Sequence, residues 1–153
     1  MQPTIIENYT DIGIDVGRIV RRIFSHLPPD ILDGLKEVRI LDKHERAFAC
    51  YRKGEAVIEI YVSNLLGDFP PIFLKVFYPF TFMVIGMAVG HEIDHHVNRN
   101  KNDIDREASA KANILKYIYP SFGIFKHIMR VFAFIGRPFR KSLMEKIKKM
   151  ETG

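Results

Sequence analysis

The sequence predicts an α+β protein in which a small sheet precedes a hairpin of two helices that bind a metal. Three observations lead to this prediction. Strand-like runs gather between residues 38 and 62, helical patterns dominate residues 80–119, and the pentapeptide HEIDH stands on the first of these helices at 91–95. A chain of 153 residues is long enough to bury the core of one domain.

An amphipathic helix is expected near the N-terminus, followed by three strands. Residues 15–25 carry apolar side chains at helical spacing, namely Val16, Ile19, Val20 and Ile23. The strand-like runs are 38–42, 47–52 and 56–62, and the third alternates between two faces. Residues 52–55 have the composition of a turn between the second and third runs. The sequence therefore predicts a small three-stranded antiparallel meander.

A long apolar run follows, from Ile72 to Gly90, with Lys75 as its one charged residue. Its length raises a transmembrane interpretation. However, Pro79 interrupts the run, and the polar sequence HEIDHH follows it without a break. These features favour a helix over residues 80–98 that is buried between other elements, with membrane association as the alternative.

A second helix is predicted after the polar turn at 97–102. Asn102 or Asp103 can cap it, and the acidic residues of its first turn suit the helix dipole. It runs to about Tyr119, where Pro120 ends it. The short turn makes the two helices an antiparallel hairpin.

The C-terminal part is predicted to be helical and basic, with helices at about 123–135 and 138–150. We expect residues 1–120 to form the minimal catalytic domain and 121–153 an extension of the same domain that could regulate it. The extension contains the excess of basic residues behind the net charge of +5. A solvated helix face explains such a charge run, so no nucleic-acid partner is expected, and contact with a membrane surface is the weaker alternative.

The pentapeptide at 91–95 matches the pattern HExxH. Residues four apart lie on the same helix face, so the imidazoles of His91 and His95 can converge on one ion. Glu92 stands beside them, where a carboxylate can accept a proton from a metal-activated water. A surface helix with chance polar residues is the alternative. The position at the end of a buried apolar segment favours a metal site, because charged groups there are costly without a partner.

Glu107 is the candidate for a third protein ligand. In an antiparallel hairpin, residues equally far from the turn lie level, and His95 and Glu107 flank the turn at similar distances. Small neighbours, Ala108, Ala110 and Ala112, let the helices approach closely. The alternative is that Glu107 only serves the helix N-terminus. The spacing thus predicts one zinc ion per chain, held by His91, His95 and Glu107.

The sequences GHEIDHH and DREASAKANIL resemble the gluzincin pattern, in which HExxH is followed by a glutamate on a second helix. The short spacing resembles the minimal members called minigluzincins. There is also likeness to the phage-immunity and radiation-response regulator peptidases, whose second helix reads E-A-N-x-F-A-A; Ser109 and Lys111 depart from it. The resemblance implies a zincin-like fold, His91, His95 and Glu107 as zinc ligands, and Glu92 as general base. It also implies that strand 56–62 forms a rim that binds an extended peptide.

Two roles of the family pattern have no clear residue here. Lys111 stands where many gluzincins carry an aspartate that orients a ligand histidine, so Asp103, Asp105 or a backbone carbonyl would have to replace it. The group that stabilises the oxyanion is also unmarked, and Tyr117, Tyr119 and His127 are its candidates.

The functional prediction is a zinc metalloendopeptidase, active or latent as isolated, that hydrolyses a peptide or protein substrate. The single cysteine and the absence of a signal-like N-terminus favour a cytoplasmic location. The alternative is a non-catalytic regulator of the same fold, or a protein that interacts with a membrane surface through its apolar and basic segments.

Overall fold

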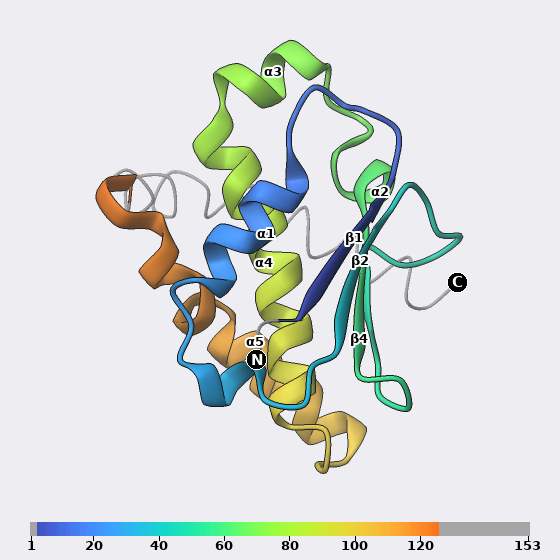
Figure 1. Ribbon diagram of the computed structural model, residues 1–153, viewed down its shortest axis with the longest axis vertical. Helices are drawn as coiled ribbons and strands as arrows, with labels where there is room; N and C mark the ends of the chain where they lie inside the picture. The colour runs from blue at the N-terminus through green and yellow to red at the C-terminus, as the bar shows by residue number, and fades with distance from the viewer. Residues whose placement is uncertain (1–2, 126–153) are drawn as a thin grey trace. The chain divides into compact units, whose positions relative to one another are not determined.

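The computed structural model describes residues 3–125, and it shows an α+β fold (Figure 1). The chain divides into two compact units, residues 1–121 and 122–153. The predicted C-terminal helices lie outside the described residues from position 126 onward, as do His127 and the basic tail. The elements discussed below belong to the first unit, except for the end of the last 3-10 segment.

The sheet has four strands in the order β1-β2-β4-β3. Their bounds are Thr4–Asn8 for β1, Glu37–Leu41 for β2, Ala49–Arg52 for β3 and Val57–Tyr61 for β4. The pairs β1–β2 and β2–β4 are parallel, whereas β3 pairs antiparallel with β4. The sheet is therefore mixed.

The predicted meander is wrong in its pairing, although its three strands exist. The turn between β3 and β4 forms as expected, with the Ala56 amide donating to the Arg52 carbonyl at 2.8 Å. However, β2 lies beside β4 and not beside β3. Every residue of β4 is buried, which suits a central strand, whereas the less buried β3 takes an edge. The short strand β1 was not predicted at all.

The helices of the first half agree with the sequence in part. The predicted N-terminal helix is α1, Val16–Phe24, which Asp15 caps by accepting a hydrogen bond from the Arg18 amide at 2.6 Å. A 3-10 turn, η1, covers Pro29–Leu32. Two short helices were missed. Val62, which the prediction placed in a strand, begins α2 (Val62–Leu66), and the double proline before Ile72 begins α3 (Pro71–Val76).

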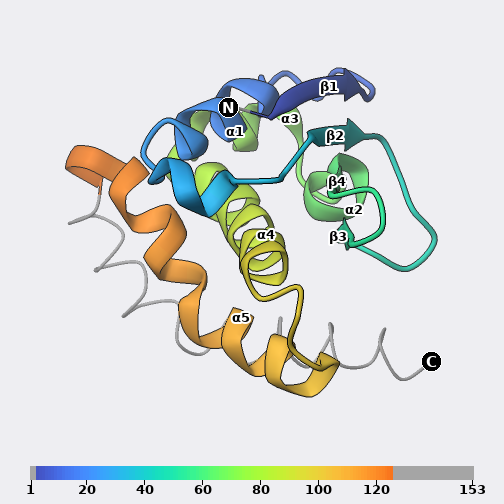
Figure 2. The same ribbon diagram turned by 60° about the horizontal axis from the view of Figure 1, so that its bottom comes forward.

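The helix hairpin is formed by α4, Tyr78–Val97, and α5, Asp103–Ile118. Asn102 caps α5 through a hydrogen bond from the Asp105 amide at 2.9 Å, as the sequence predicts. The chain continues as a 3-10 segment, η2, over Tyr119–Phe125. Helix α4 lies between the sheet and α5 (Figure 2).

The core lies between one face of the sheet and the helices α1 and α4. Both strands at the centre of the sheet send fully buried side chains there: Val38, Ile40, Ile58 and Ile60. From α1 come Val16, Ile19, Val20 and Ile23, and from α4 come Ile85, Val89 and Ile93. Among the described residues, no helix has both the length and the apolar character needed to span a bilayer. The apolar run after Ile72 instead bends between α3 and α4.

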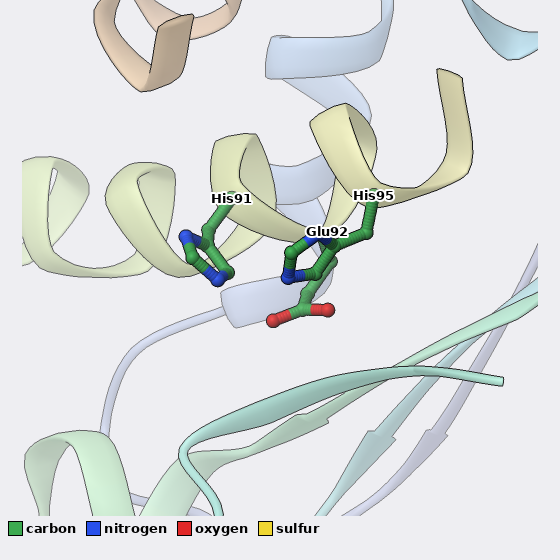
Figure 3. Close-up of side chains that lie close together, drawn as sticks. All are labelled: His91, Glu92 and His95. Carbon is green, nitrogen blue, oxygen red and sulfur yellow. The ribbon is translucent and has the colours of Figure 1, made fainter. Parts of the chain in front are cut away.

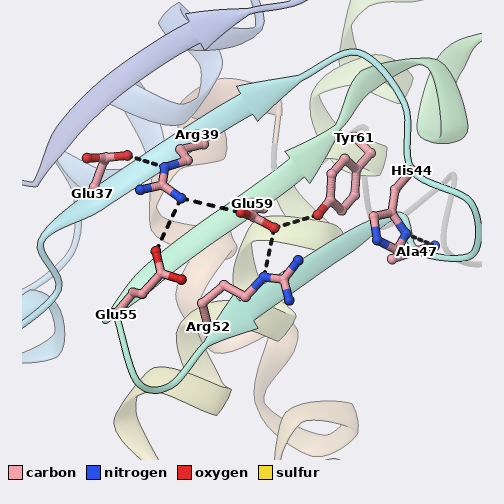
Figure 4. Close-up of polar contacts among 8 residues, drawn as sticks. All are labelled: Glu37, Arg39, His44, Ala47, Arg52, Glu55, Glu59 and Tyr61. Atoms are coloured by element: carbon pink, nitrogen blue, oxygen red, sulfur yellow. Dashed lines mark hydrogen bonds and ion pairs between the residues drawn. The ribbon is translucent and has the colours of Figure 1, made fainter.

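The opposite face of the sheet carries a network of charged side chains (Figure 4). Arg39 contacts Glu37, Glu55 and Glu59, and Arg52 donates from Nε to Glu59 at 2.9 Å. The hydroxyl of Tyr61 also donates to Glu59, at 2.5 Å. Each carboxylate of this network therefore has a cationic partner.

Candidate metal centre

Three side chains of α4 form a cluster that could hold a metal ion, His91, Glu92 and His95. One ligand atom from each lies within 4.8 Å of the others. Figure 3 shows the three side chains leaving the same side of the helix. Their spacing of one helical turn produces this arrangement, as the sequence predicts.

The Glu107 carboxylate on α5 faces both imidazoles. Its Oε1 lies 3.0 Å from His95 Nε2, and its Oε2 lies 3.7 Å from His91 Nε2. The antiparallel course of α5 brings Glu107 level with the two histidines. Its position meets the geometric expectation, while its function as a metal ligand stays a prediction.

The imidazoles favour the neutral form, which is the form that binds metals. Burial lowers the pKa of His91 below its ordinary value, and the proximity of His95 lowers it further. Burial also lowers the pKa of His95, against the opposing effect of Glu107. Neutral imidazole nitrogens beside a carboxylate are the donor set that a divalent cation such as zinc requires.

Glu92 is 5% exposed, and its environment disfavours its charge. Burial raises its pKa to about 8, although a hydrogen bond from the Tyr51 backbone and the positive charge of Arg106 act in the opposite direction. The carboxyl group therefore titrates near neutral pH, where a group that moves protons is most effective.

Close packing between α4 and α5 keeps the glutamate near the histidines. A Cβ atom at Gly90 would lie only 3.0 Å from the Ile114 carbonyl oxygen and 3.1 Å from Ile118 Cγ2. A glycine immediately before His91 thus allows α5 to pass close to the turn of α4 that carries His91 and His95.

His96 directly follows the HEIDH segment, where helix geometry points it about 100° away from His95, towards solvent or a supporting position. It is 1% exposed and therefore does not face solvent. Its Nδ1 lies 3.0 Å from the Tyr51 hydroxyl, and its Nε2 lies 2.9 Å from the Asp33 carbonyl oxygen. His96 therefore connects α4 to β3 and to the loop after η1.

The predicted supporting residues lie in other surroundings. Asp103 is paired with Arg106 at 2.5 Å, and Asp105 accepts from the Asn102 side chain at 2.8 Å, so both carboxylates are engaged at the start of α5. The Tyr117 hydroxyl donates to Asp94 at 2.9 Å. Tyr119 begins η2, and twelve helical residues from Glu107 correspond to about 18 Å along the axis. The structure thus brings neither tyrosine to the histidine pair, and His127 lies outside the described residues.

Two residues near the cluster were missed. Asp94 is fully buried between α4 and α5, within HEIDH itself, where the pattern leaves the position open. Arg106 directly precedes Glu107, and its Nε is buried without a hydrogen-bond partner. The neighbourhood of Arg106 depends on how α5 packs against α4, which no local pattern reveals.

The sequence and the structure were also compared with known proteins. No protein-family model, no curated protein and no solved structure matches this chain. The case for a function thus depends on the site itself.

Proposed function

We propose that this protein is a zinc-dependent peptidase of the gluzincin type. The observation that supports the proposal most is the convergence of His91, His95 and Glu107 from two helices, with Glu92 beside them. Two imidazoles and one carboxylate are the protein ligands of a catalytic zinc site that leaves one position open. The hairpin of a HExxH helix and a glutamate helix is consistent with a zincin-like fold.

Each residue has a distinct chemical task in this proposal. His91, His95 and Glu107 would hold the zinc, which would supply a Lewis acid for the scissile carbonyl and for a water molecule. Glu92 would accept a proton from the attacking water and give it to the departing amine, which returns its side chain to the carboxylate form. Without a metal, the pKa of about 8 keeps Glu92 largely protonated at pH 7, and the charge of a bound cation would favour the carboxylate form that accepts a proton.

The substrate is proposed to lie along β3. The rim expected at strand 56–62 is wrong, because β4 has neighbours on both sides, β2 and β3. Within the described part of the sheet, β3 is the edge. The Phe48 carbonyl accepts from the Tyr61 amide, so by alternation the main-chain groups of Ala49 and Tyr51 point away from β4. The Tyr51 amide already donates to Glu92, so an extended peptide can pair with the main-chain groups of Ala49 and with the Tyr51 carbonyl, beside the metal-binding helix.

Arg106 is proposed to bind the substrate carbonyl oxygen. Its positive charge acts on Glu92, His95 and Tyr51, three groups from two different elements around the cluster. Its partner Asp103 is exposed, so the ion pair between them costs little to rearrange. Arg106→Gln should lower kcat about 10²- to 10³-fold and leave zinc content unchanged. Arg99→Gln is the matched control, and an equal loss in both variants would contradict the assignment.

The test of the proposed function combines metal analysis with a digest of a peptide library. The purified full chain should contain about one zinc per chain and cleave peptides, and a chelator should abolish both properties. The double variant His91→Ala, His95→Ala should lose the metal and the activity together. Full retention of metal by this variant would refute the site.

An interaction with a membrane surface is the second candidate. One observation favours it: Ile72 is 72% and Val76 68% exposed on α3, next to exposed Phe77. Aliphatic and aromatic side chains at a surface can insert among lipid head groups. Sedimentation with anionic vesicles tests this function, and Ile72→Asp with Val76→Asp should abolish binding. Cleavage of peptides by a protein that does not sediment would favour the peptidase.

A further inference from the structure

Asp94 lies on α4 between the two histidines of the cluster and is 0% exposed. Its Oδ1 accepts hydrogen bonds from the Tyr117 hydroxyl at 2.9 Å and the Asn113 amide at 3.2 Å. Its Oδ2 accepts from the Asn98 amide at 2.9 Å. Both oxygens act as acceptors, as in an ionised carboxylate. All of these donors are neutral, so none of them compensates the negative charge.

The partners of Asp94 form a polar stripe along α5. Ser109, Asn113 and Tyr117 are spaced by four residues and thus share one face of the helix. The Asn98 amide reaches Ser109 Oγ at 3.1 Å, and Asp94 reaches the next two members of the stripe. Sliding α5 by one turn, about 5.4 Å, would break all of these bonds. The stripe therefore fixes the level of α5 on α4, and with it the level of Glu107.

The charge of Asp94 also acts on the metal-binding side chains. It favours positive charge at both imidazoles, so its field extends over the position that a cation would occupy. A buried charge is costly unless an opposite charge balances it. A divalent cation between His91 and His95 would provide that balance.

We propose that Asp94 is a positioning residue of the metal centre, which holds Glu107 level with the histidines and raises the affinity for a divalent cation by its charge, which no cationic side chain within residues 3–125 pairs with. The inference depends on the metal site of the proposed function and not on peptide hydrolysis. Asp94 acts without ligating the ion.

The test is a zinc titration of the full chain against a competing chelator. Asp94→Asn removes the charge at nearly constant size, and the zinc affinity should fall about 10- to 100-fold. Asn113→Lys retains a hydrogen-bond donor for Asp94 and adds a positive charge that compensates the carboxylate. The position is half-buried, so the lysine amine can be accommodated there with access to solvent. The zinc affinity of this variant should also fall, whereas the control Leu115→Lys, which adds the same charge at an exposed position of α5, should bind zinc like the wild type.

The visible spectrum of bound Co²⁺ provides a measurement that a purely structural defect would change. Weaker binding by Asn113→Lys with an unchanged spectrum supports the charge effect, because the ligands are then the same. Unchanged affinity in a folded Asp94→Asn variant overturns the proposal. If that variant does not fold, unchanged affinity in Asn113→Lys overturns it. Absence of zinc binding by the wild type would instead refute the metal site itself.

Discussion

The two buried glutamates among residues 3–125, Glu59 in the sheet and Glu92 in α4, differ in how their charges are compensated. They are 7% and 5% exposed, respectively. Burial alone would raise the pKa of Glu59, but hydrogen bonds from Tyr61 and Arg52 and the charge of Arg39 lower it below the ordinary value. The pKa of Glu92 rises to about 8 because burial outweighs its one backbone hydrogen bond and the charge of Arg106.

This difference separates a carboxylate that stabilises the fold from one that is available for chemistry. The Glu59 network already satisfies its charge, so an ion or a substrate has nothing to add there. The α4–α5 hairpin instead gathers Glu92, Asp94 and Glu107 around imidazoles and neutral donors. A strongly perturbed carboxyl group in such surroundings indicates a functional site.

The largest expected effect comes from removing the charge of Glu92, with the same substitution at Glu59 as the comparison. Glu92→Gln should lower peptide hydrolysis about 10²- to 10⁴-fold and retain zinc, because the side chain moves a proton and does not ligate the ion. Glu59→Gln should keep its turnover within a few-fold of the wild type but lose about 1–3 kcal/mol of stability, because buried donors lose their acceptor. Initial rates and zinc content of both variants check this contrast. Equal rates in the two variants would remove the distinction.

The second effect concerns Glu107, the proposed third ligand. Glu107→Ala should weaken zinc binding more than about 100-fold, whereas Asp105→Ala should cost less than about 10-fold, because Asp105 is engaged with Asn102 and not with the histidines. Chelator competition measures both affinities. A loss of the same size at Asp105 would show that Glu107 is not the ligand.

A smaller effect is expected on the pH dependence of stability without metal. The folded chain holds the Glu92 proton more tightly than the unfolded chain, since the pKa rises from 4.5 to about 8. The stabilising contribution is therefore complete below pH 4.5 and is lost as the pH rises through 8. The variant Glu92→Gln has no titratable group at this position, so its stability does not fall in this way as the pH rises. In chelator it should match the wild type near pH 4 and exceed its stability at pH 8 by on the order of 1–3 kcal/mol. Urea unfolding in chelator measures the free energy of unfolding of both proteins. The same difference between them at every pH would contradict this prediction.

The smallest effect should follow from weakening the compensation of Glu59. Arg52→Gln removes one of its cations but leaves Arg39, and Arg52 is 46% exposed. The expected loss of stability is about 0.5–1 kcal/mol. Because the pKa of Glu59 is lowered in the folded chain, its ionised form stabilises the fold at pH values above the ordinary pKa of a glutamate. This contribution disappears as the pH falls through the lowered pKa. The difference between variant and wild type should thus be larger at pH 7 than at pH 3, and thermal unfolding at both pH values measures it.

The sequence predicts the hairpin better than the sheet, for a physical reason. HExxH, the Asn102 cap and the acidic first turn of α5 are local features, and helix geometry converts their spacing directly into positions. Pairing between strands depends on contacts that are distant in sequence. Placing β4 between β2 and β3 requires knowing that both of its faces are buried, and local alternation does not reveal which strand lies at the edge.

The same distinction holds within the site. The proximity of His91, His95 and Glu107 could be predicted because each position follows from a turn or a spacing. The burial of His96 could not, since its partners are the Asp33 carbonyl oxygen and Tyr51. The connection of Asp94 to Asn113 and Tyr117 likewise depends on the crossing of two helices.

Within residues 3–125, β3 is an edge strand, and this has a consequence for self-association. Main-chain groups at an edge that can align a peptide can also align the same strand of another copy, which would join two sheets into one. The chain limits this risk in two ways: β3 is only four residues long, and Arg52 at its end and Lys53 after it would place like charges side by side in an in-register parallel pair. A peptidase built on this edge would therefore remain open to foreign chains while it repels its own.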